Sequence, residues 1–212
     1  DHCFSRIEEV RHFKPQVAVI ANPASHHLDM ALTLAQQGVH LLVEKPLYSK
    51  ASQRVLELIE ICREHHVVLM VGYNLRFLPS LRVFRDFLQQ DKVGKIYSIR
   101  AEVGQYLPDW RPNTDYRKTV SAKKELGGGV LLELSHEIDY LQWLFGKVDW
   151  VKAHVMRHSD LEIDVEDTAY ILLGFKPDKL GSQRVASLNM DFIRHDTSRQ
   201  CAVIGNKGTL RW

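Results

Sequence analysis

Lys45 stands where a side chain could act on a bound hydroxyl group. It follows a short, mostly apolar run at residues 39–43 that is typical of a buried strand, and Pro46 comes directly after it. Ligands of parallel sheets collect at the carboxyl ends of the strands. An ammonium group there can orient and polarise a substrate hydroxyl. The alternative for the same residues is a surface ion pair between Glu44 and Lys45 at a strand end.

His136 is the second candidate, and it has acidic neighbours at helical spacing. A helix is predicted from the three glycines at 127–129 to Leu144, and on it Glu133, His136 and Asp139 recur every three residues. A carboxylate one turn before an imidazole can fix its tautomer and raise its basicity, as a general base requires. The alternative is that His136 packs against a sheet while the two acids are solvated.

The first third of the chain, which carries Lys45, alternates between short apolar runs and amphipathic helical patterns. Apolar runs with short connections favour right-handed β-α-β units in a parallel sheet. This pattern ends near Arg76. Buried strands are predicted at 17–21, 39–43 and 67–71, and helices at about 27–37 and 49–64.

Beyond Gly94, apolar and polar residues alternate as in half-buried strands. One helix inside a run of antiparallel strands predicts an open sheet whose other face is solvated or covered by another copy of the chain. The predicted fold class is therefore α/β, with parallel β-α-β units at 1–76 and an α+β domain with an open, mainly antiparallel sheet at 77–212. Its strands are predicted near 96–103, 148–157, 167–175, 184–190 and 200–204, and a further helix at 79–90.

The composition argues against several classes of partner. Among the 212 residues, 28 Lys and Arg face 26 Asp and Glu, so a net charge of +2 gives no electrostatic case for nucleic acid or a membrane surface. No apolar run is long enough to cross a bilayer. The three cysteines, at 3, 62 and 201, have no metal-type spacing, which predicts no metal site and buried or idle thiols in a reducing cytoplasm.

A polar, aromatic loop runs from Gln105 to about Leu126 and is predicted to lie over a substrate. Aromatic rings offer flat faces to a sugar, and guanidinium groups can hold a carboxylate or phosphate. The alternative is an oligomer contact, or a loop packed by its own aromatic residues. The candidate side chains are Trp110, Arg111, Tyr116 and Arg117.

Polar motifs follow each predicted strand of the first part, and another opens the later helix. They are Asn22-Pro23-Ala24-Ser25-His26-His27, Glu44-Lys45-Pro46, Gly72-Tyr73-Asn74-Leu75-Arg76-Phe77 and the triglycine. In this order, over residues 17–212, they resemble the glucose-fructose oxidoreductase / inositol dehydrogenase (Gfo/Idh/MocA) family of nicotinamide-dependent enzymes. The stretches 165–169 and 204–210 also resemble the family's C-terminal sheet. The resemblance implies the C-terminal half of a dinucleotide-binding Rossmann domain at 1–76 and a substrate domain at 77–212.

The resemblance also implies a reaction, namely hydride transfer between NAD or NADP and a hydroxyl carbon of a sugar, polyol or sugar nucleotide. Lys45 would polarise the hydroxyl and His136 would take or return its proton. The family's acidic partner is usually an aspartate four residues before the histidine. Here Glu133 lies three residues before it, and Asp139 is a second candidate.

Further site residues are implied by position in the matching motifs. For the cofactor they are Asn22, Pro23, His27, Glu44, Lys45 and Asn74. For the substrate they are Arg76, Trp110, Arg111, Tyr116, Arg117 and Asp139. The sequence of the 105–126 loop resembles that of family members associated with surface-polysaccharide or amino-sugar metabolism. This resemblance favours a sugar nucleotide or an acidic sugar as the substrate.

One departure from the family is large, because no Gly-x-Gly-x-x-Gly turn occurs in these residues. The chain also starts without methionine, and residues 208–212 look like a strand just begun, so we expect it to be cut at both ends. Without the glycine-rich segment, we expect the first strand to be left at an unpaired edge, and the polypeptide alone to bind cofactor poorly and be inactive. An alternative is a catalytically silent relative that senses a sugar or dinucleotide. A homodimer or homotetramer through the open sheet face is expected in either case.

Overall fold

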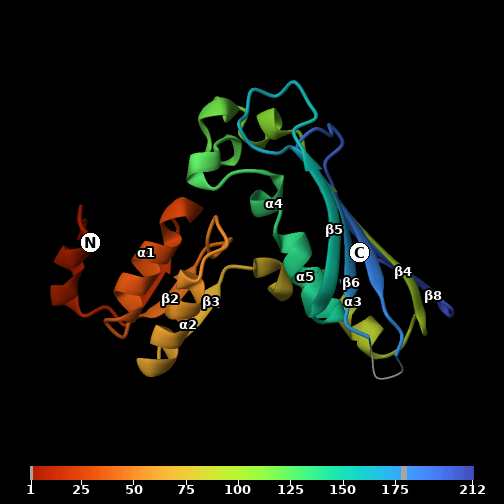
Figure 1. Ribbon diagram of the computed structural model, residues 1–212, viewed down its shortest axis with the longest axis horizontal. Coiled ribbons are helices and arrows are strands. Elements are labelled where there is room, and N and C mark those ends of the chain that lie inside the picture. Colours follow the sequence, from red (N-terminus) through yellow and green to blue (C-terminus); the bar gives the residue numbers. More distant parts are fainter. Residues whose placement is uncertain (1, 178–180) are drawn as a thin grey trace. The chain divides into compact units, whose positions relative to one another are not determined.

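The first unit of the fold is organised around a three-stranded parallel sheet (Figure 1). The computed structural model describes residues 2–177 and 181–212 and divides between Gly72 and Tyr73 into two compact units. Parallel pairing in the order β1-β2-β3 confirms the predicted β-α-β pattern. The elements are the 3₁₀ helix η1 (Ile7–Phe13), β1 (Val17–Ile20), α1 (Ala24–Ala35), β2 (His40–Val43), α2 (Arg54–Glu64) and β3 (Leu69–Val71).

Both helices of this unit share one hydrophobic core with the sheet. Leu28 and Leu32 from α1 and Leu58 from α2 pack in the same cluster as the strand residues Leu41 and Val43. Two consecutive right-handed crossovers in the same direction place both helices on the same face, which explains the shared core.

The opposite side of the sheet is exposed in the described part of the chain. Val17 and Val19 on β1 are 60% and 64% exposed, and Val68 and Met70 beside and on β3 are also exposed. The sequence predicts buried strands at 17–21 and 67–71, and this prediction is wrong for most of β1 and for β3. An apolar run cannot tell whether one or two faces will be covered.

Two helix starts also differ from the prediction. The first helix starts at Ala24 and not at His27, directly after Pro23. The second starts at Arg54 and not at Ser49. The hydroxyl of Ser52 accepts a hydrogen bond from the Arg54 amide at 3.2 Å, which satisfies a donor at the helix start.

The second unit is a six-stranded open sheet with helices on one face (Figure 1). The strand order is β5-β6-β7-β4-β8-β9, and every neighbouring pair is antiparallel except β4 with β7, which confirms the mainly antiparallel prediction. The strands are β4 (Ile96–Gly104), β5 (Val148–Met156), β6 (Thr168–Phe175), β7 (Val185–Asp191), β8 (Ser198–Gly205) and β9 (Gly208–Arg211). The last strand, β9, pairs with β8 after the turn that reverses the chain, at residues whose sequence predicts the start of a strand.

The remaining elements of this unit are short helices that precede or follow β4. They are η2 (Asn74–Phe77), α3 (Pro79–Gln89), η3 (Leu107–Trp110), η4 (Tyr116–Lys118), η5 (Val120–Ala122), η6 (Lys124–Leu126), α4 (Val130–Glu133) and α5 (His136–Phe145). The single helix predicted up to Leu144 is wrong, because the backbone turns at Leu134 and Ser135 and α5 begins afresh at His136.

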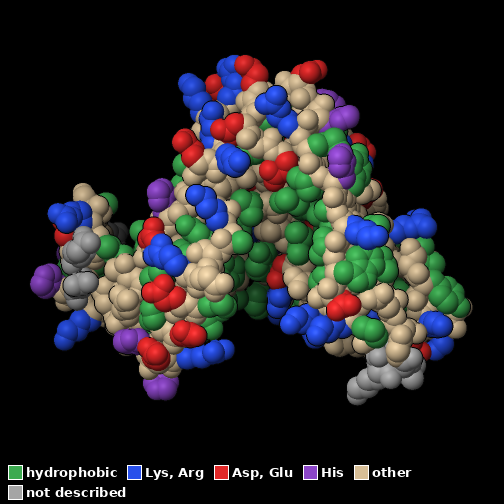
Figure 2. All heavy atoms as spheres, in the orientation of Figure 1, with side chains coloured by type: hydrophobic (Ala, Val, Ile, Leu, Met, Phe, Trp, Pro, Cys, Tyr) green, Lys and Arg blue, Asp and Glu red, His purple; other side chains and the backbone are tan. Residues whose placement is uncertain are grey.

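The two faces of the second sheet differ in character. Ile99, Leu188 and Val203 point into the core beneath α5, where Tyr140 and Leu141 are fully buried. On the other face Tyr170 and Leu172 of β6 remain exposed. Figure 2 shows apolar side chains at the surface of the molecule among the charged ones. No helix in the described residues is both long and apolar enough to span a membrane.

Candidate active site

The turns that follow the three parallel strands lie together at one edge of the first sheet. The Glu44 amide after β2 donates to the Ile20 carbonyl of β1 at 2.8 Å, and the Gly72 amide after β3 donates to the Val43 carbonyl of β2 at 2.8 Å. Gly72 allows a close approach, since an added Cβ would lie 3.0 Å from Glu44 Oε2. The Lys45–Pro46 peptide at this edge is cis.

Asn22 presents an acceptor at this edge. Its Oδ1 is buried and has no hydrogen-bond partner among the described residues, while its Nδ2 donates to Met30 Sδ at 3.9 Å. The Ser25 hydroxyl, in the first turn of α1, is likewise buried and without a partner there. Buried polar atoms are normally satisfied, so these two suit a ligand that brings an N–H or O–H group.

His27 lies beside these turns. Both hydrogen-bonding contacts that the structure shows for its ring are to backbone atoms. His27 is 1% exposed, and its ring nitrogens approach the carbonyl oxygens of Pro46 and Asn22. A hollow of about 940 Å³ lies at the opposite, amino ends of β1 and β2, lined by Lys14 and His40 among others, and it contains none of the predicted site residues.

In the second unit, the structure pairs two predicted substrate ligands with each other. Arg76 Nε donates to Asp139 Oδ2 at 2.8 Å, and its terminal nitrogen donates to Oδ1 at 2.6 Å. This two-pronged ion pair joins η2 to α5 and raises the pKa of Arg76. Asp139 is therefore occupied by Arg76, which makes Glu133 the stronger candidate for the acid beside His136.

The ring of Tyr73 stands against His136, with centroids 5.6 Å apart and an interplanar angle of 84°. Burial raises the pKa of the Tyr73 phenol. No pattern in the sequence predicts this contact, although Tyr73 belongs to the Gly72–Phe77 motif. The Tyr73 ring packs against the imidazole at the start of α5.

We expect the Arg76–Asp139 pair to be energetically coupled. A double-mutant cycle with Arg76→Met and Asp139→Asn should give a coupling free energy of about 1 kcal/mol, reduced by solvent because the Arg76 side chain is 42% exposed. The Arg54–Asp29 pair, with side chains 50% and 63% exposed, is the matched control and should show much weaker coupling. Equal coupling in the two cycles would contradict the role given to burial here.

The glycines before α4 are required by close approaches. Gly129 has φ of +107°, and an added Cβ would overlap the Glu166 carboxylate; one on Gly128 would overlap the Val120 carbonyl. Glu166 accepts a hydrogen bond from the Leu131 amide at 3.1 Å, and its own carbonyl accepts one from Val130. It thus caps α4 from 35 residues away, a contact that no local pattern in the sequence indicates.

Asp167, next to this cap, fixes the connection between β5 and β6. It is fully buried, and burial alone would raise its pKa. Hydrogen bonds from the Ser159 hydroxyl, the His158 and Ser159 amides and the Thr168 hydroxyl outweigh burial, so the pKa of Asp167 is lowered. The charged carboxylate therefore organises the segment that carries Glu166.

Replacing Gly129 by alanine should destabilise the second unit by about 2 kcal/mol, from backbone strain and displacement of Glu166. Gly146→Ala is the matched control, because Gly146 has φ of +94° and nothing within 4 Å of an added Cβ. Thermal unfolding followed by tryptophan fluorescence measures this unit alone, since all four tryptophans lie in it. A larger loss in Gly146→Ala would contradict the overlap argument.

The loop at 105–126 is held by its own side chains and by neighbours far along the chain. Trp110 donates to the Gln105 carbonyl at 3.1 Å, and its ring stands edge-on to Phe192 with centroids 5.2 Å apart. Tyr116 accepts from the Glu162 amide at 3.2 Å. These contacts favour the alternative of a loop packed by its own aromatic residues.

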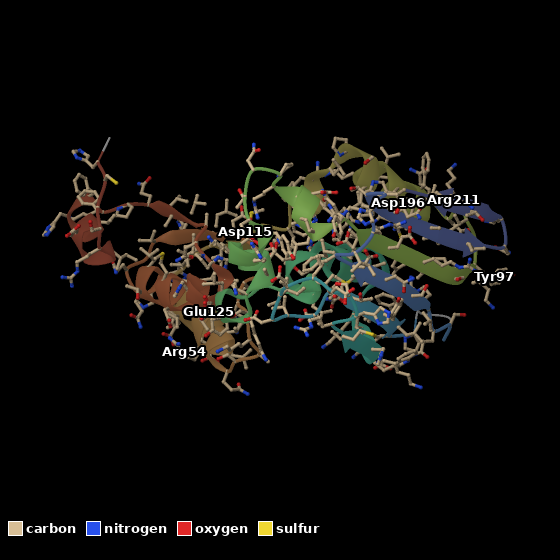
Figure 3. The ribbon with its side chains drawn as sticks, turned by 90° about the horizontal axis from the view of Figure 1, so that it is seen from above. Arg54, Tyr97, Asp115, Glu125, Asp196 and Arg211 are labelled. Atoms are coloured by element: carbon tan, nitrogen blue, oxygen red, sulfur yellow. The ribbon has the colours of Figure 1, made fainter. Side chains whose placement is uncertain are left out.

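The two arginines of the loop differ. Arg117 donates to Asp115 at 2.8 and 3.1 Å and to Glu162 at 3.0 Å, and these carboxylates raise its pKa. Asp115, labelled in Figure 3, has its pKa lowered by the same guanidinium. Arg111 is exposed, and it remains the loop's candidate for an anionic substrate group.

Comparison with known proteins gives the same two parts. Residues 2–73 match the family model for an oxidoreductase with an NAD-binding Rossmann fold, and residues 81–211 match the GFO/IDH/MocA C-terminal domain. In the part of the chain that the structure describes, no group of three or more His, Cys, Asp or Glu side chains could hold a metal ion.

Relatives resemble this chain over most of its length. Trans-1,2-dihydrobenzene-1,2-diol dehydrogenase of Xenopus laevis is 32% identical over 202 residues, which cover 93% of this chain and 56% of that protein. The WlbA dehydrogenase of Bordetella pertussis, in complex with NADH and UDP-GlcNAcA, superposes with a TM-score of 0.82 at 26% identity and covers 98% of this chain and 58% of that one. A myo-inositol 2-dehydrogenase of Lactobacillus plantarum shares the fold, with a TM-score of 0.81 at 18% identity, covering 99% of this chain and 61% of its own. The chain thus spans rather more than half the length of these relatives.

Proposed function

The chain belongs to the GFO/IDH/MocA family of oxidoreductases, and from this membership we propose that the protein transfers a hydride between NAD or NADP and a hydroxyl-bearing carbon of a sugar, polyol or sugar nucleotide. The observation that carries the proposal is the match of both units, in order, to the family's two models. The complex of the WlbA dehydrogenase with NADH and UDP-GlcNAcA supports the cofactor and the substrate class.

The first unit fits a nicotinamide cofactor. Its parallel strands end at a common edge, and Asn22 Oδ1 there is a buried acceptor without a partner among the described residues. We propose that Asn22, Pro23, Glu44, Lys45 and, from the second unit, Asn74 hold the cofactor. When bound, NAD or NADP would supply the hydride acceptor or donor.

Two side chains are proposed to act on the substrate hydroxyl. The Lys45 ammonium donates a hydrogen bond to the hydroxyl oxygen and stabilises the negative charge that grows on it. A ring nitrogen of His136 takes the hydroxyl proton on oxidation and returns it on reduction. Glu133 is the acid proposed to orient this imidazole, because Asp139 is bound to Arg76.

We propose that the exposed face of the second sheet mediates self-association, supported by the exposed Tyr170 and Leu172. The expected dimer or tetramer is measured by sedimentation.

We propose that the protein works in a reducing cytoplasm. The three cysteines are free thiols, which supports this location.

The test of function uses the product of the complete reading frame. It is incubated with NAD or NADP and a panel of sugars, polyols and sugar nucleotides, and the absorbance of the reduced nicotinamide is followed. Turnover of at least one substrate class is expected. Ligand binding without turnover across the panel would favour a catalytically silent sensor, and absence of both would overturn the proposal.

A further inference from the structure

Both ring nitrogens of His27 lie at hydrogen-bonding distance from backbone carbonyl oxygens. Nδ1 is 2.8 Å from the Pro46 oxygen and Nε2 is 2.7 Å from the Asn22 oxygen. The side chain is 1% exposed, so water has little access to either contact. The ring thus spans the turn after β1 and the turn after β2.

The number of donors decides what these contacts require. A carbonyl oxygen only accepts hydrogen bonds, while a neutral imidazole has one N–H donor and one nitrogen lone pair. Either neutral tautomer would bond one carbonyl and direct its lone pair at the other. Turning the ring over would place carbon atoms at these positions and lose both short contacts. A ring with both nitrogens protonated donates to both carbonyls.

We propose that His27 is held as the doubly protonated imidazolium and clamps the turn after β1 to the turn after β2. Its bond to the Pro46 carbonyl fixes the residue that directly follows Lys45, and its bond to the Asn22 carbonyl fixes the residue whose Oδ1 is an unmatched acceptor. His27 is therefore a positioning residue for Lys45 and Asn22. The clamp does not depend on the proposed reaction, whereas its importance for hydride transfer rests on it.

The ionisable side chains closest along the contacting elements do not take over this role. Glu44 and Lys45 belong to the clamped turn, and Glu44 is exposed, with its carboxylate beside Gly72. His26 and Asp29 on α1 are exposed. Burial disfavours the charged form of this ring, and in the proposed clamp the two charge-assisted hydrogen bonds to the carbonyl dipoles of Asn22 and Pro46 offset that cost.

The first experiment measures the ring itself by NMR of the chain labelled with ¹⁵N-histidine at neutral pH. Both ring nitrogens of His27 should show the chemical shifts of protonated nitrogens, with bonded hydrogens that exchange slowly with water. His27→Gln assigns the signals, and His26→Gln is the matched control at the exposed neighbouring position. One unprotonated nitrogen in the His27 ring would overturn the proposal.

The second experiment measures positioning. In His27→Gln, the backbone amides of Lys45 and Leu47 should change chemical shift, and their hydrogen exchange should accelerate on the order of tenfold, because a charge-assisted bond to the turn is lost. His26→Gln should leave both unchanged. Unchanged amides in a folded His27→Gln would remove the positioning role. Should that variant not fold, His27→Asn replaces it, and the wild-type ring measurement still decides the protonation. Neither measurement needs substrate or cofactor, so failure of the proposed reaction would leave both results interpretable.

Discussion

Turnover in the product of the complete reading frame is expected to fall by about 10²- to 10⁴-fold when Lys45 is replaced by methionine, and by a similar factor when His136 is replaced by alanine. Methionine keeps the unbranched shape and most of the length of the lysine side chain but cannot donate a hydrogen bond to the substrate oxygen. Alanine removes the group that accepts the hydroxyl proton. Both groups act as charge moves in the transition state, so the loss should appear in kcat more than in KM.

The double variant gives a sharper test of shared action. When two groups act on one hydroxyl, removing one already removes most of the benefit of the other. Lys45→Met combined with His136→Ala should therefore lower turnover by far less than the product of the two single losses. Lys50→Met, at an exposed lysine in the same segment, is the control and should retain full activity. Full turnover in either single variant would remove that residue from the mechanism, and multiplicative losses would argue against action on one hydroxyl.

The parallel part of the fold could be predicted because its signals are local. Uninterrupted apolar runs, a glycine after α1 and short connections are all visible within a few residues, and they specify right-handed crossovers. The exposed face of β1 could not be predicted in the same way. Whether Val17 and Val19 are covered depends on which other elements are present, and the strand's own sequence carries no record of that.

The break between α4 and α5 shows a second limit. The apolar spacing of Leu131, Leu134, Ile138 and Leu141 continues through the break, so periodicity predicts one helix. Part of what holds α4 comes from Glu166, which is distant in sequence. Because the helix breaks, Glu133 and His136 lie on separate helices. The prediction that they pair assumes one continuous helix with a single turn between them, and that assumption is wrong.

Candidate ligands on loops and helices were predicted by residue type, and type alone does not reveal a partner within the protein. Arg76 finds Asp139 63 residues away, and Arg117 finds Glu162 45 residues away. Residue type predicts that Arg117 holds a substrate anion, and the family resemblance implies that Arg76 binds substrate. In the structure each guanidinium holds a carboxylate of the chain. Only the tertiary fold distinguishes these two uses of an arginine.

Glu137 is the clearest example of a buried charged residue that the sequence pattern does not predict. It lies beside the predicted apolar stripe of α5, yet its side chain is 0% exposed, and Arg199 Nε of β8 donates to its Oε1 at 2.8 Å. The surroundings are poorly solvated: burial raises the pKa of Tyr140 well above its usual range and that of the Cys201 thiol to about 12. A carboxylate in such a place needs a cation.

Replacing Arg199 by methionine should therefore lower the free energy of unfolding of the second unit by roughly 3 kcal/mol. This is the lower end for buried pairs, because the Arg199 side chain is 35% exposed and water can reach the vacated side. The melting temperature, followed by tryptophan fluorescence, should fall on the order of 10 °C.

The cause of that loss can be separated from lost packing. In a Glu137→Gln background the same Arg199→Met change should cost far less, because an amide leaves no unpaired charge in the core. Arg211→Met, at an exposed arginine on the neighbouring strand β9, is the control and should change the melting temperature little. An equal loss in both backgrounds would assign the effect to the stem of Arg199 instead of its charge. His136 immediately precedes Glu137 at the start of α5, so the ion pair that anchors this turn to β8 also holds the backbone from which the proposed base acts.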